Sequence, residues 1–494
     1  MALTGSDYIL VLPLAVLGAG GLWSFLFGRC FPRATPWVIT LAAMAPVVTA
    51  WRIYGDVMEG NPLYVRFTQI LPPVGLSLYA DGLGLFMFIL VGFAGLLITL
   101  YSFGYESEDP KKYRFYAFLL FAMLGLAGVA IAGDLFTFFL FFEIMSLSIM
   151  GVVAQAETPD AYDASMKFLF LTVIASISLF LAVVITYHLK GSVDLVPNGA
   201  PMPQSSLAFL AFLGFLIAFG VKAGMVPLHI WLPDAHANAP SPGSALLSGL
   251  TVKTGAYGLI RVVYSVFGVV FMEETGWNRI ILDMSVVTIL VGSAAAIAQV
   301  GIKRRLAYST VTQLGYVLMG VGLLSPVALV GAIYHIFTHC FMKGCLFMCA
   351  GSMIHTAKKR RIPDLAGIGL EMPVTMTGFT IAALTMVGVP PLNAFVSKWQ
   401  LSLGALDKGA PLLVAVLLVS SIMNAAYYFP IVISAFFGKP GSRFVWKDSP
   451  WIMLVPLLIL AVGCIVFTLA PVNWPLVLAE RAARCVMGPG GFTP

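Results

Sequence analysis

The feature that most constrains this chain is a succession of fourteen apolar runs, each close to the length that crosses a lipid bilayer. A membrane helix needs about 20 apolar residues, and the runs lie at 6–28, 36–55, 80–103, 113–131, 134–154, 164–189, 206–227, 243–268, 280–299, 305–323, 327–354, 371–403, 411–437 and 450–470. Residues of the types AVILMFWYC make up 60% of the 494 residues, whereas soluble domains hold about 45–50%. The sequence therefore predicts an all-α polytopic membrane protein with about 14 transmembrane helices.

The short loops predict how these spans are oriented. An even number of spans places both termini on one side, and Lys and Arg gather in cytoplasmic loops. Fifteen Lys and Arg fall in one set of loops, with clusters at 111–114, 303–305 and 358–361, against seven in the other set and the C-terminal tail. We expect a multi-pass protein of the cell inner (cytoplasmic) membrane with both termini outside the cytoplasm. The first run lacks a basic leader, so we interpret it as a retained helix rather than a signal peptide.

Composition also excludes some classes of function. Because topology accounts for the net charge of +6, no basic face is left for nucleic acid. The six cysteines form no CxxC pair, and a metal shell around the Cys340, Cys345 and Cys349 helix would need ligands from several other helices. No nucleotide, flavin, haem or cluster motif is present, so we expect no cofactor, no metal and no catalytic residue in this chain.

Six basic residues fall inside the predicted spans rather than in loops: Lys167, Lys222, Lys253, Arg261, Lys343 and Lys398. The stretch from 218 to 261 carries Lys222 before a break rich in proline and Lys253 after it. Charged side chains and broken helices are tolerated at membrane depth only where they face protein or a hydrated cavity. This pattern indicates a path for an ion or a substrate.

Glu143 is a carboxyl group close to the middle of its span. It lies nine residues after Asp134, which is ~14 Å along a helix axis. Either it locks two helices as an ion pair or a neutral acid, or it carries protons; we favour the second interpretation. A nearby Lys222 whose distance to Glu143 varied could then take up and release a proton.

The break after Lys222 holds three more polar side chains, His229, Asp234 and His236. Histidine titrates near neutrality, so these residues could relay protons to the cytoplasmic surface, or they could satisfy freed backbone groups. Lys167 is either functional or an anchor that reaches the headgroups. Tyr257 follows Lys253 by one turn and could extend its polar stripe.

Two later spans repeat this pattern. His335, His339 and Lys343 follow one another at i, i+4 and i+8, which places three titratable groups on one helix face and favours a proton relay. Lys398 follows a break at Pro390 and Pro391, whereas Lys222 precedes its break. Such an arrangement is expected if two halves are related as inverted repeats.

Several motifs together resemble one family. They are FFEIMSL around Glu143, the long stretch GVKAGMVPLHIWLPDAHANAPSPGSALLSGLTVKTGAYGLIR, KRRLAYSTVTQLGYV, HIFTHCFMKGCLFM and VGVPPLNAFVSKW. The chain resembles the antiporter-like membrane subunits shared by respiratory complex I, related membrane-bound hydrogenases and Mrp-type multisubunit sodium/proton antiporters. Two departures stand out: some branches have glutamate at the position of Lys398, and the chain lacks the long lateral C-terminal helix of some members.

The resemblance implies a domain organisation. Scaffold helices would occupy 1–110, two inverted five-helix repeats with one broken helix each would occupy 111–268 and 279–437, and a C-terminal helix and tail would occupy 438–494. It also implies roles: Glu143 and Lys222 as a charge-coupled pair, Lys253 with His335, His339 and Lys343 as the central link, and Lys398 as the terminal proton-exchanging residue.

The function expected from this resemblance is proton translocation, or sodium/proton exchange, by one subunit of a multisubunit redox-driven membrane complex such as a complex I-like NADH:quinone oxidoreductase or a membrane-bound hydrogenase. Its partners would be other antiporter-like and small membrane subunits and a peripheral redox arm. Iron–sulfur clusters, a NiFe centre, flavin or quinone would belong to those partners. An Mrp-type antiporter without a redox partner, a stand-alone solute carrier and a quinone-reducing enzyme are the alternatives.

Overall fold

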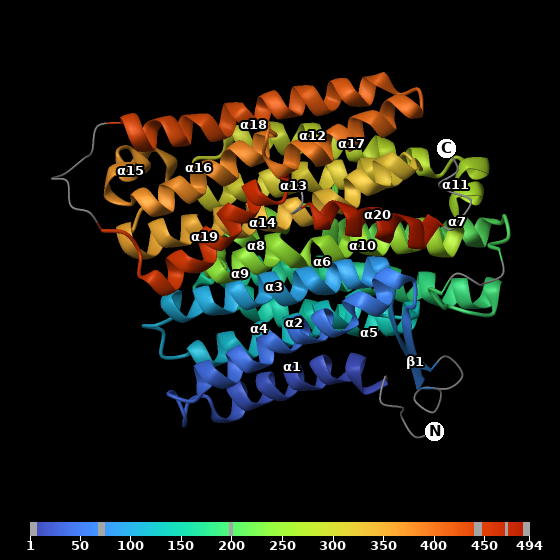
Figure 1. The fold of residues 1–494 in the computed structure, drawn as a ribbon, viewed down its shortest axis with the longest axis horizontal. Helices are drawn as coiled ribbons and strands as arrows, with labels where there is room; N and C mark the ends of the chain where they lie inside the picture. Colours follow the sequence, from blue (N-terminus) through green and yellow to red (C-terminus); the bar gives the residue numbers. More distant parts are fainter. Residues whose placement is uncertain (1–6, 68–74, 197–200, 439–446, 470–472, 488–494) are drawn as a thin grey trace.

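The structure is a computed structural model that describes residues 7–67, 75–196, 201–438, 447–469 and 473–487. Lys439 and Arg443, which contribute to the predicted basic loops, and the GPGGFTP tail lie outside these ranges. The chain is a bundle of roughly parallel and antiparallel helices (Figure 1).

The first half of the chain contains these elements: α1 (Asp7–Phe27), α2 (Thr35–Glu59), β1 (Leu63–Phe67), β2 (Leu76–Ala80), α3 (Gly82–Tyr105), α4 (Lys112–Ala130), α5 (Leu135–Ala154), α6 (Pro159–Lys190), α7 (Ser206–Ala223), α8 (Leu232–Asn238), α9 (Ser241–Leu246), η1 (Leu247–Thr251), α10 (Lys253–Ile260), η2 (Arg261–Phe267) and α11 (Val269–Thr275). The second half contains α12 (Asn278–Ala298), α13 (Ile302–Gly322), α14 (Pro326–Ala357), η3 (Ile362–Leu365), α15 (Ile368–Glu371), α16 (Pro373–Val387), α17 (Asn393–Asp407), α18 (Pro411–Phe437), α19 (Trp451–Val466) and α20 (Trp474–Met487).

Each of the fourteen apolar runs coincides with one helix or a broken pair, which confirms the all-α membrane fold. Ten helices of the described ranges are long and apolar enough to span a membrane, or eleven with the bent pair Ser241–Phe267 and Val269–Thr275. The other three predicted spans differ for physical reasons. Polar residues lower the hydropathy of α13, a break divides α16 from α17, and α19 has 16 residues. The count of fourteen stays a prediction.

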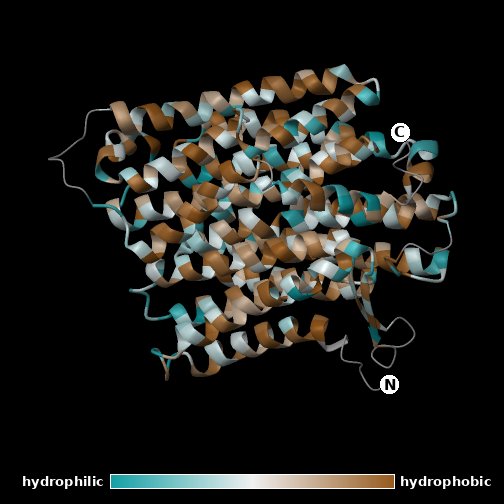
Figure 2. Ribbon diagram, viewed as in Figure 1, coloured by the Kyte–Doolittle hydropathy of each residue, from teal (hydrophilic) through white to brown (hydrophobic). Residues whose placement is uncertain are grey.

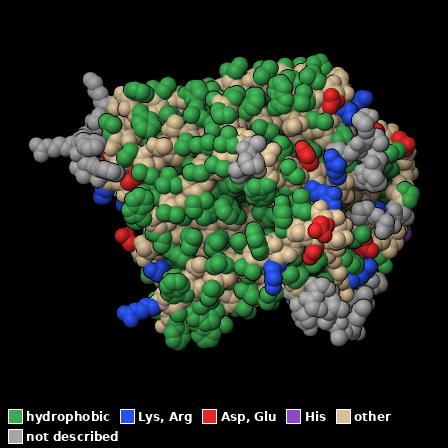
Figure 3. Space-filling view, in the orientation of Figure 1, with side chains coloured by type: hydrophobic (Ala, Val, Ile, Leu, Met, Phe, Trp, Pro, Cys, Tyr) green, Lys and Arg blue, Asp and Glu red, His purple; other side chains and the backbone are tan. Residues whose placement is uncertain are grey.

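The surface of the bundle matches a lipid environment. Hydrophobic side chains cover its middle, while charged side chains gather at the two ends (Figure 3). We name these ends by what they carry. The basic end, on the left in Figure 1, includes the loops after α1, α3, α12 and α14; the hairpin end, on the right, holds β1, β2 and α11.

Burial sorts the helices into lipid-facing and central ones. Brown, hydrophobic helices form the edges of the bundle, whereas teal and white residues are mixed into its centre (Figure 2). In their most apolar windows, α18 is 28% buried and α1 is 33% buried, whereas α14 is 100% buried. Polar residues on α14 therefore meet other helices rather than lipid.

Both predicted helix breaks are present, and each stands beside its lysine. Helix α7 ends one residue after Lys222, where Gly224 takes a left-handed conformation with φ of 68°. Helix α16 ends at Gly388, with φ of 91°, and α17 starts five residues before Lys398. Positive φ suits glycine, which has no Cβ to clash with the backbone.

Three features were not predicted from the sequence. The connection at 51–79 includes the antiparallel hairpin β1–β2. The span at 243–268 is not a uniform α-helix, because the π-helical segments η1 and η2 enclose α10. The C-terminal region forms the 14-residue α20, whose buried Leu478, Ala482 and Val486 recur at helical spacing and pack on α3 and α14.

Candidate functional site

The centre of the bundle holds three titratable side chains on one face of α14. His335, His339 and Lys343 are all fully buried. The rings of His335 and His339 stack with centroids 6.0 Å apart and planes 11° apart. The predicted stripe is thus a row of buried groups enclosed by protein.

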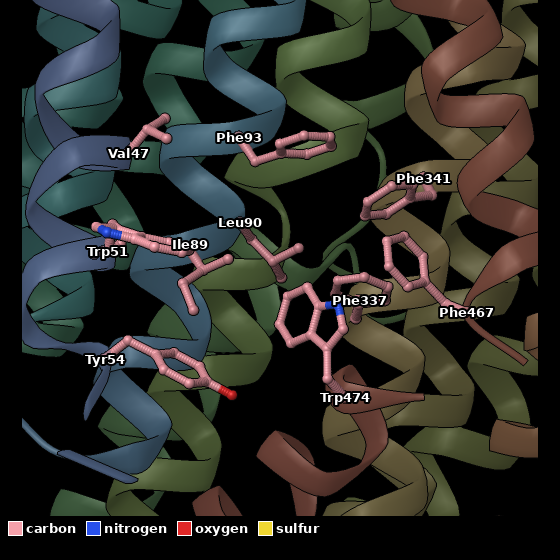
Figure 4. A pocket seen from close by; sticks show the side chains of 11 residues that line it. Val47, Trp51, Tyr54, Ile89, Leu90, Phe93, Phe337, Phe341, Phe467 and Trp474 are labelled. Atoms are coloured by element: carbon pink, nitrogen blue, oxygen red, sulfur yellow. The ribbon is translucent and has the colours of Figure 1, made fainter. Parts of the chain in front are cut away.

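The opposite face of α14 has a different character. There Phe337 and Phe341 line an apolar cavity of about 380 Å³ with Trp51 of α2, Leu90 of α3 and Trp474 of α20 (Figure 4). Residues two apart on a helix point in nearly opposite directions, so α14 separates this cavity from the histidines. Its aromatic and aliphatic lining offers an ion no charged ligand.

His335 connects α14 to two neighbouring helices. Its Nδ1 lies 2.8 Å from Ser397 Oγ on α17, and its Nε2 lies 3.0 Å from Gln313 Oε1 on α13. With both ring nitrogens engaged, the imidazole is held in one orientation. Because Ser397 directly precedes Lys398, this contact brings the α14 row to the second broken helix.

Lys398 lies at that break and is almost fully buried. Its Nζ donates to the carbonyl oxygens of Met386 and Val387 at 3.0 and 2.9 Å and to Ser421 Oγ at 3.0 Å. The two carbonyls belong to the last turn of α16, where helix ends leave acceptors without an intrahelical donor. The break therefore supplies the ligands that hold a buried ammonium group.

Lys343 is held by another set of oxygens. Its Nζ donates to the Leu306 carbonyl at 2.7 Å, to Ser309 Oγ, and to Tyr428 OH at 3.3 Å. None of these partners is a carboxylate, so the charge of a protonated Lys343 is solvated by dipoles alone. A lysine in such surroundings gives up its proton more readily than one in an ion pair.

Lys253 lies at the junction of the row. It begins α10, between the two π-helical segments, and its Nζ donates to the Ser248 carbonyl. Its charge acts on His335, His339 and Lys343. His339, beside it, has two buried ring nitrogens without a hydrogen-bond partner. Such an imidazole is free to take up and pass on a proton.

Lys222 occupies a separate pocket in the first half of the chain. The side chain is fully buried, and Nζ lies 4.5 Å from the ring centroid of Phe168 and 5.2 Å from that of Phe142. It also donates to Thr172 Oγ1 on α6 at 3.2 Å. Two aromatic faces stabilise the ammonium group without neutralising it.

Glu143 and Lys222 communicate through α6 rather than by direct contact. Ser176 Oγ donates to the Glu143 carboxylate and also to the Thr172 carbonyl, one turn away on the same helix. Thr172 in turn accepts from Lys222. The charge of Glu143 acts on Lys222, so the predicted pair is present as a hydrogen-bonded chain across three helices.

The residues considered for a cytoplasmic relay separate into two groups. Asp234 forms ion pairs with Lys167 and, at 2.7 Å, with Arg304 at the basic end, where all three side chains are partly exposed. This arrangement is typical of an interfacial anchor. His236 is instead fully buried with neither ring nitrogen bonded, and His229 packs against Tyr308 with one buried nitrogen unbonded.

Tyr257 is engaged in structure rather than in the row. Its hydroxyl donates to the Ala130 carbonyl at 2.7 Å and accepts from Arg261 Nε at 3.0 Å. Arg261 pairs with Asp81, a residue that we did not predict as part of any site. Its signal in the sequence was a carboxylate at the start of an apolar run.

Sequence reasoning also missed the hydroxyl groups that hold the lysines. Ser397 stands next to Lys398, and Thr172 and Ser176 are one turn apart, but serine and threonine in apolar runs are common and their partners lie far away in sequence. Among the described residues, no group of three or more His, Cys, Asp or Glu could hold a metal ion.

Comparison with known proteins agrees with this geometry. Residues 132–435 match the family described as NADH:quinone oxidoreductase/Mrp antiporter, TM, and residues 72–116 match NADH-Ubiquinone oxidoreductase (complex I), chain 5 N-terminus. The first match covers more than half of the chain. The chain belongs to this family of antiporter-like membrane subunits.

Relatives of this antiporter-like subunit come from different complexes. It is 34% identical to NADH-quinone oxidoreductase subunit N of Desulforudis audaxviator, over 93% of this chain and 95% of that one. It is 29% identical to hydrogenase-4 component B of Escherichia coli, over 83% of this chain and 65% of that one. A chain in the structure of the Mrp complex from Dietzia sp. shares the fold, with a TM-score of 0.87, 22% identity and coverage of 99% of both chains.

The family match also places the site within the subunit. All seven residues predicted for transport, from Glu143 to Lys398, fall inside the matched region 132–435, as does Arg261. Asp81 falls in the other matched region, 72–116. The Asp81–Arg261 ion pair therefore joins the two matched regions of this antiporter-like subunit.

Proposed function

We propose that this chain translocates protons, or exchanges sodium for protons, as one subunit of a multisubunit membrane complex driven by redox chemistry in its partners. The observation that carries the proposal is the row of buried titratable groups on α14, which reaches Lys398 through Ser397 and Lys253 through charge. Family membership supports the same function, because relatives named for complex I and for a hydrogenase share this chain's sequence.

Transport in this row rests on repulsion between like charges at low dielectric. A proton that arrives at Lys253 or His339 makes a second positive charge on Lys343 unfavourable, because charges interact several-fold more strongly there than in water. Lys343 then loses its proton toward the next group in the row. Neutral partners such as Ser309 and Tyr428 leave this balance adjustable.

Glu143 and Lys222 would set the state of the row. When the Glu143 carboxylate is charged, it favours a protonated Lys222; when it is neutral, Lys222 is more easily deprotonated. Ser176 and Thr172 hold the two groups at a fixed separation. Lys222 and Lys398 lie on opposite sides of their breaks, which supports two inverted repeats at 111–268 and 279–437.

The complex would supply what this chain lacks. Redox cofactors would lie in partner subunits, in an inner-membrane assembly whose basic end faces the cytoplasm. The fold shared with a chain of the Mrp complex favours one alternative, an antiporter without a redox arm. Purification from native membranes would separate the two, because the co-purifying subunits include redox proteins only in the first case.

The transport proposal is tested by reconstitution of the intact complex into proteoliposomes with a pH-sensitive dye inside. We expect Lys343→Ala and Lys398→Ala to abolish proton flux while the complex assembles in normal amount. Lys408→Ala is the matched control, because Lys408 forms an exposed ion pair with Glu273 away from the row. Normal flux in both row variants would refute the proposal.

A further inference from the structure

The basic end of the molecule contains a cavity that the transport row does not account for. It has a volume of about 500 Å³ and lies among four connections, those between α3 and α4, α5 and α6, α8 and α9, and α12 and α13. Its lining is polar and includes Glu106, Asp109, Lys303 and Arg360. It differs in this respect from the apolar cavity beside Phe337.

Glu106 is a buried carboxyl group in the wall of this cavity. The residue is 5% exposed, and its Oε1 has no hydrogen-bond partner. Its charged neighbours are Asp109 in the same loop and Lys303 at the start of α13; Tyr101 and Tyr105 of α3 and Tyr116 of α4 also face it. Burial, and then the charge of Asp109, raise the pKa of Glu106 to about 8, against the opposing effect of Lys303. A carboxyl group with such a pKa exchanges protons near neutral pH.

His236 lies further toward the centre of the bundle. Its ring stacks on Phe347 of α14 at 4.7 Å, and neither buried nitrogen has a hydrogen-bond partner. Three cations act on this ring: Lys303 at the basic end, and Lys343 and Lys253 in the row. His236 thus stands between the cavity and the row.

Lys303 is the common neighbour of the two unpartnered groups. Its charge acts on both Glu106 and His236. Its Nζ donates to the carbonyl of Ala239, three residues beyond His236, in the turn that forms part of the cavity wall. The order along the molecule is therefore Glu106, Lys303, His236 and then Lys343 and Lys253.

We propose that this cavity is the site where the subunit takes up protons from the aqueous phase, with Glu106 as the acceptor and Lys303 and His236 as the link to the row. The inference rests on the proposed transport function and adds its point of uptake. In each step the O–H bond of the Glu106 acid breaks and an N–H bond forms at the Lys303 amine, which has passed its own proton to a ring nitrogen of His236. The Glu106 carboxylate takes its next proton from water.

The test uses the intact complex in proteoliposomes, with initial proton flux measured between pH 6 and pH 9. Glu106→Gln removes the acceptor with little change of shape, Glu106→Asp keeps a carboxyl group, and Glu108→Gln removes an exposed carboxylate two residues away. We expect Glu106→Gln to lower the flux at pH 8 by roughly tenfold, with a smaller loss at pH 6 where protons are abundant. Glu106→Asp should restore most of the flux, and Glu108→Gln should leave it unchanged.

Two results would overturn the inference. One is a Glu106→Gln flux equal to the wild type over the whole pH range. The other is an equal loss in the Glu106→Gln and Glu108→Gln variants, which would indicate a general effect of surface charge. Lys398→Ala, measured in parallel, separates this inference from the proposed function: normal flux in that variant refutes transport through the row, whatever Glu106 does.

Access to the cavity provides a second measurement. Asn238→Cys places a thiol in its lining, in a Cys30→Ser background that removes the exposed native cysteine. A membrane-impermeant, positively charged methanethiosulfonate added from the basic end should block proton flux, and the same reagent added from the hairpin end should not. Unchanged flux after complete modification from the basic end would contradict uptake through this cavity.

Discussion

Asp81 and Arg261 lie 180 residues apart in the sequence and form a bidentate ion pair, with both N–O distances at 2.6 Å. Both side chains are almost fully buried. Asp81 also accepts from the Gly84 amide at the start of α3, and Tyr257 links the arginine to the end of α4. A buried pair with its remaining hydrogen bonds satisfied fastens α3, α4 and α10 near the hairpin end.

Loss of one partner of this pair should destabilise the fold. Asp81→Asn leaves Arg261 as a buried charge without a counter-ion, and such changes cost about 3–5 kcal/mol. Thermal unfolding of the purified protein in detergent measures the effect. Glu273→Gln, which breaks an exposed pair with Lys408, should cost less than about 1 kcal/mol. Equal unfolding temperatures for Asp81→Asn and the wild type would show that the pair does not hold the helices.

Lys398 should not tolerate arginine. A guanidinium group keeps its proton at physiological pH, so Lys398→Arg preserves the charge but removes proton exchange, and we expect flux in proteoliposomes to fall to background. In addition, Lys343→Ala and Lys398→Ala combined should lose less transport than the two single losses together, because both act in one row. Normal transport by Lys398→Arg, or independent effects in the double variant, would indicate structural charges.

The hydrogen-bonded chain on α6 should matter for coupling. Ser176→Ala removes the hydroxyl that contacts Glu143, and a hydrogen bond to a charged group contributes about 1.5–3 kcal/mol, or roughly tenfold or more in an equilibrium. We expect proton flux to fall by about that factor while assembly persists. Ser178→Ala, on the other side of the same helix, is the control. Equal flux in the two variants would contradict a role for Ser176.

Glu106 should make stability depend on pH. Its folded pKa of about 8 lies above the ordinary value of 4.5, so the unfolded state loses its proton first. Folded-state stability is then complete below pH 4.5 and falls as the pH rises to about 8, by up to about 1.4 kcal/mol per pH unit. Glu106→Gln lacks this loss, so its unfolding temperature should exceed that of the wild type at pH 9 and match it at pH 4.5. A pH-independent difference would refute the raised pKa.

Orientation in the membrane can be tested at the basic loop after α14. A cysteine in place of Lys359 should react with a membrane-impermeant thiol reagent only when the cytoplasmic side is exposed, since Lys and Arg concentrate in cytoplasmic loops. Cys30→Ser provides the background. Labelling in intact cells would reverse the predicted topology and place the cavity at Glu106 on the outside.

Local sequence was sufficient for several conclusions because the bilayer imposes strict local rules. Runs of about 20 apolar residues must form helices, and each predicted run coincides with one. Proline and glycine fixed the two breaks. Helical periodicity alone placed His335, His339 and Lys343 on one face, and their burial in α14 agrees with that expectation.

Only the tertiary structure decided which side chains meet. The contacts of Asp81 with Arg261, Ser176 with Glu143, and His335 with Ser397 join residues that lie 33 to 180 positions apart, and no local pattern specifies such pairs. Serine and threonine are ordinary residues in apolar helices, so their role as ligands depends on which charged group packs beside them. The sequence by itself determined the membrane fold and the titratable residues it carries; helix packing decided which of them join the row and which only hold the structure together.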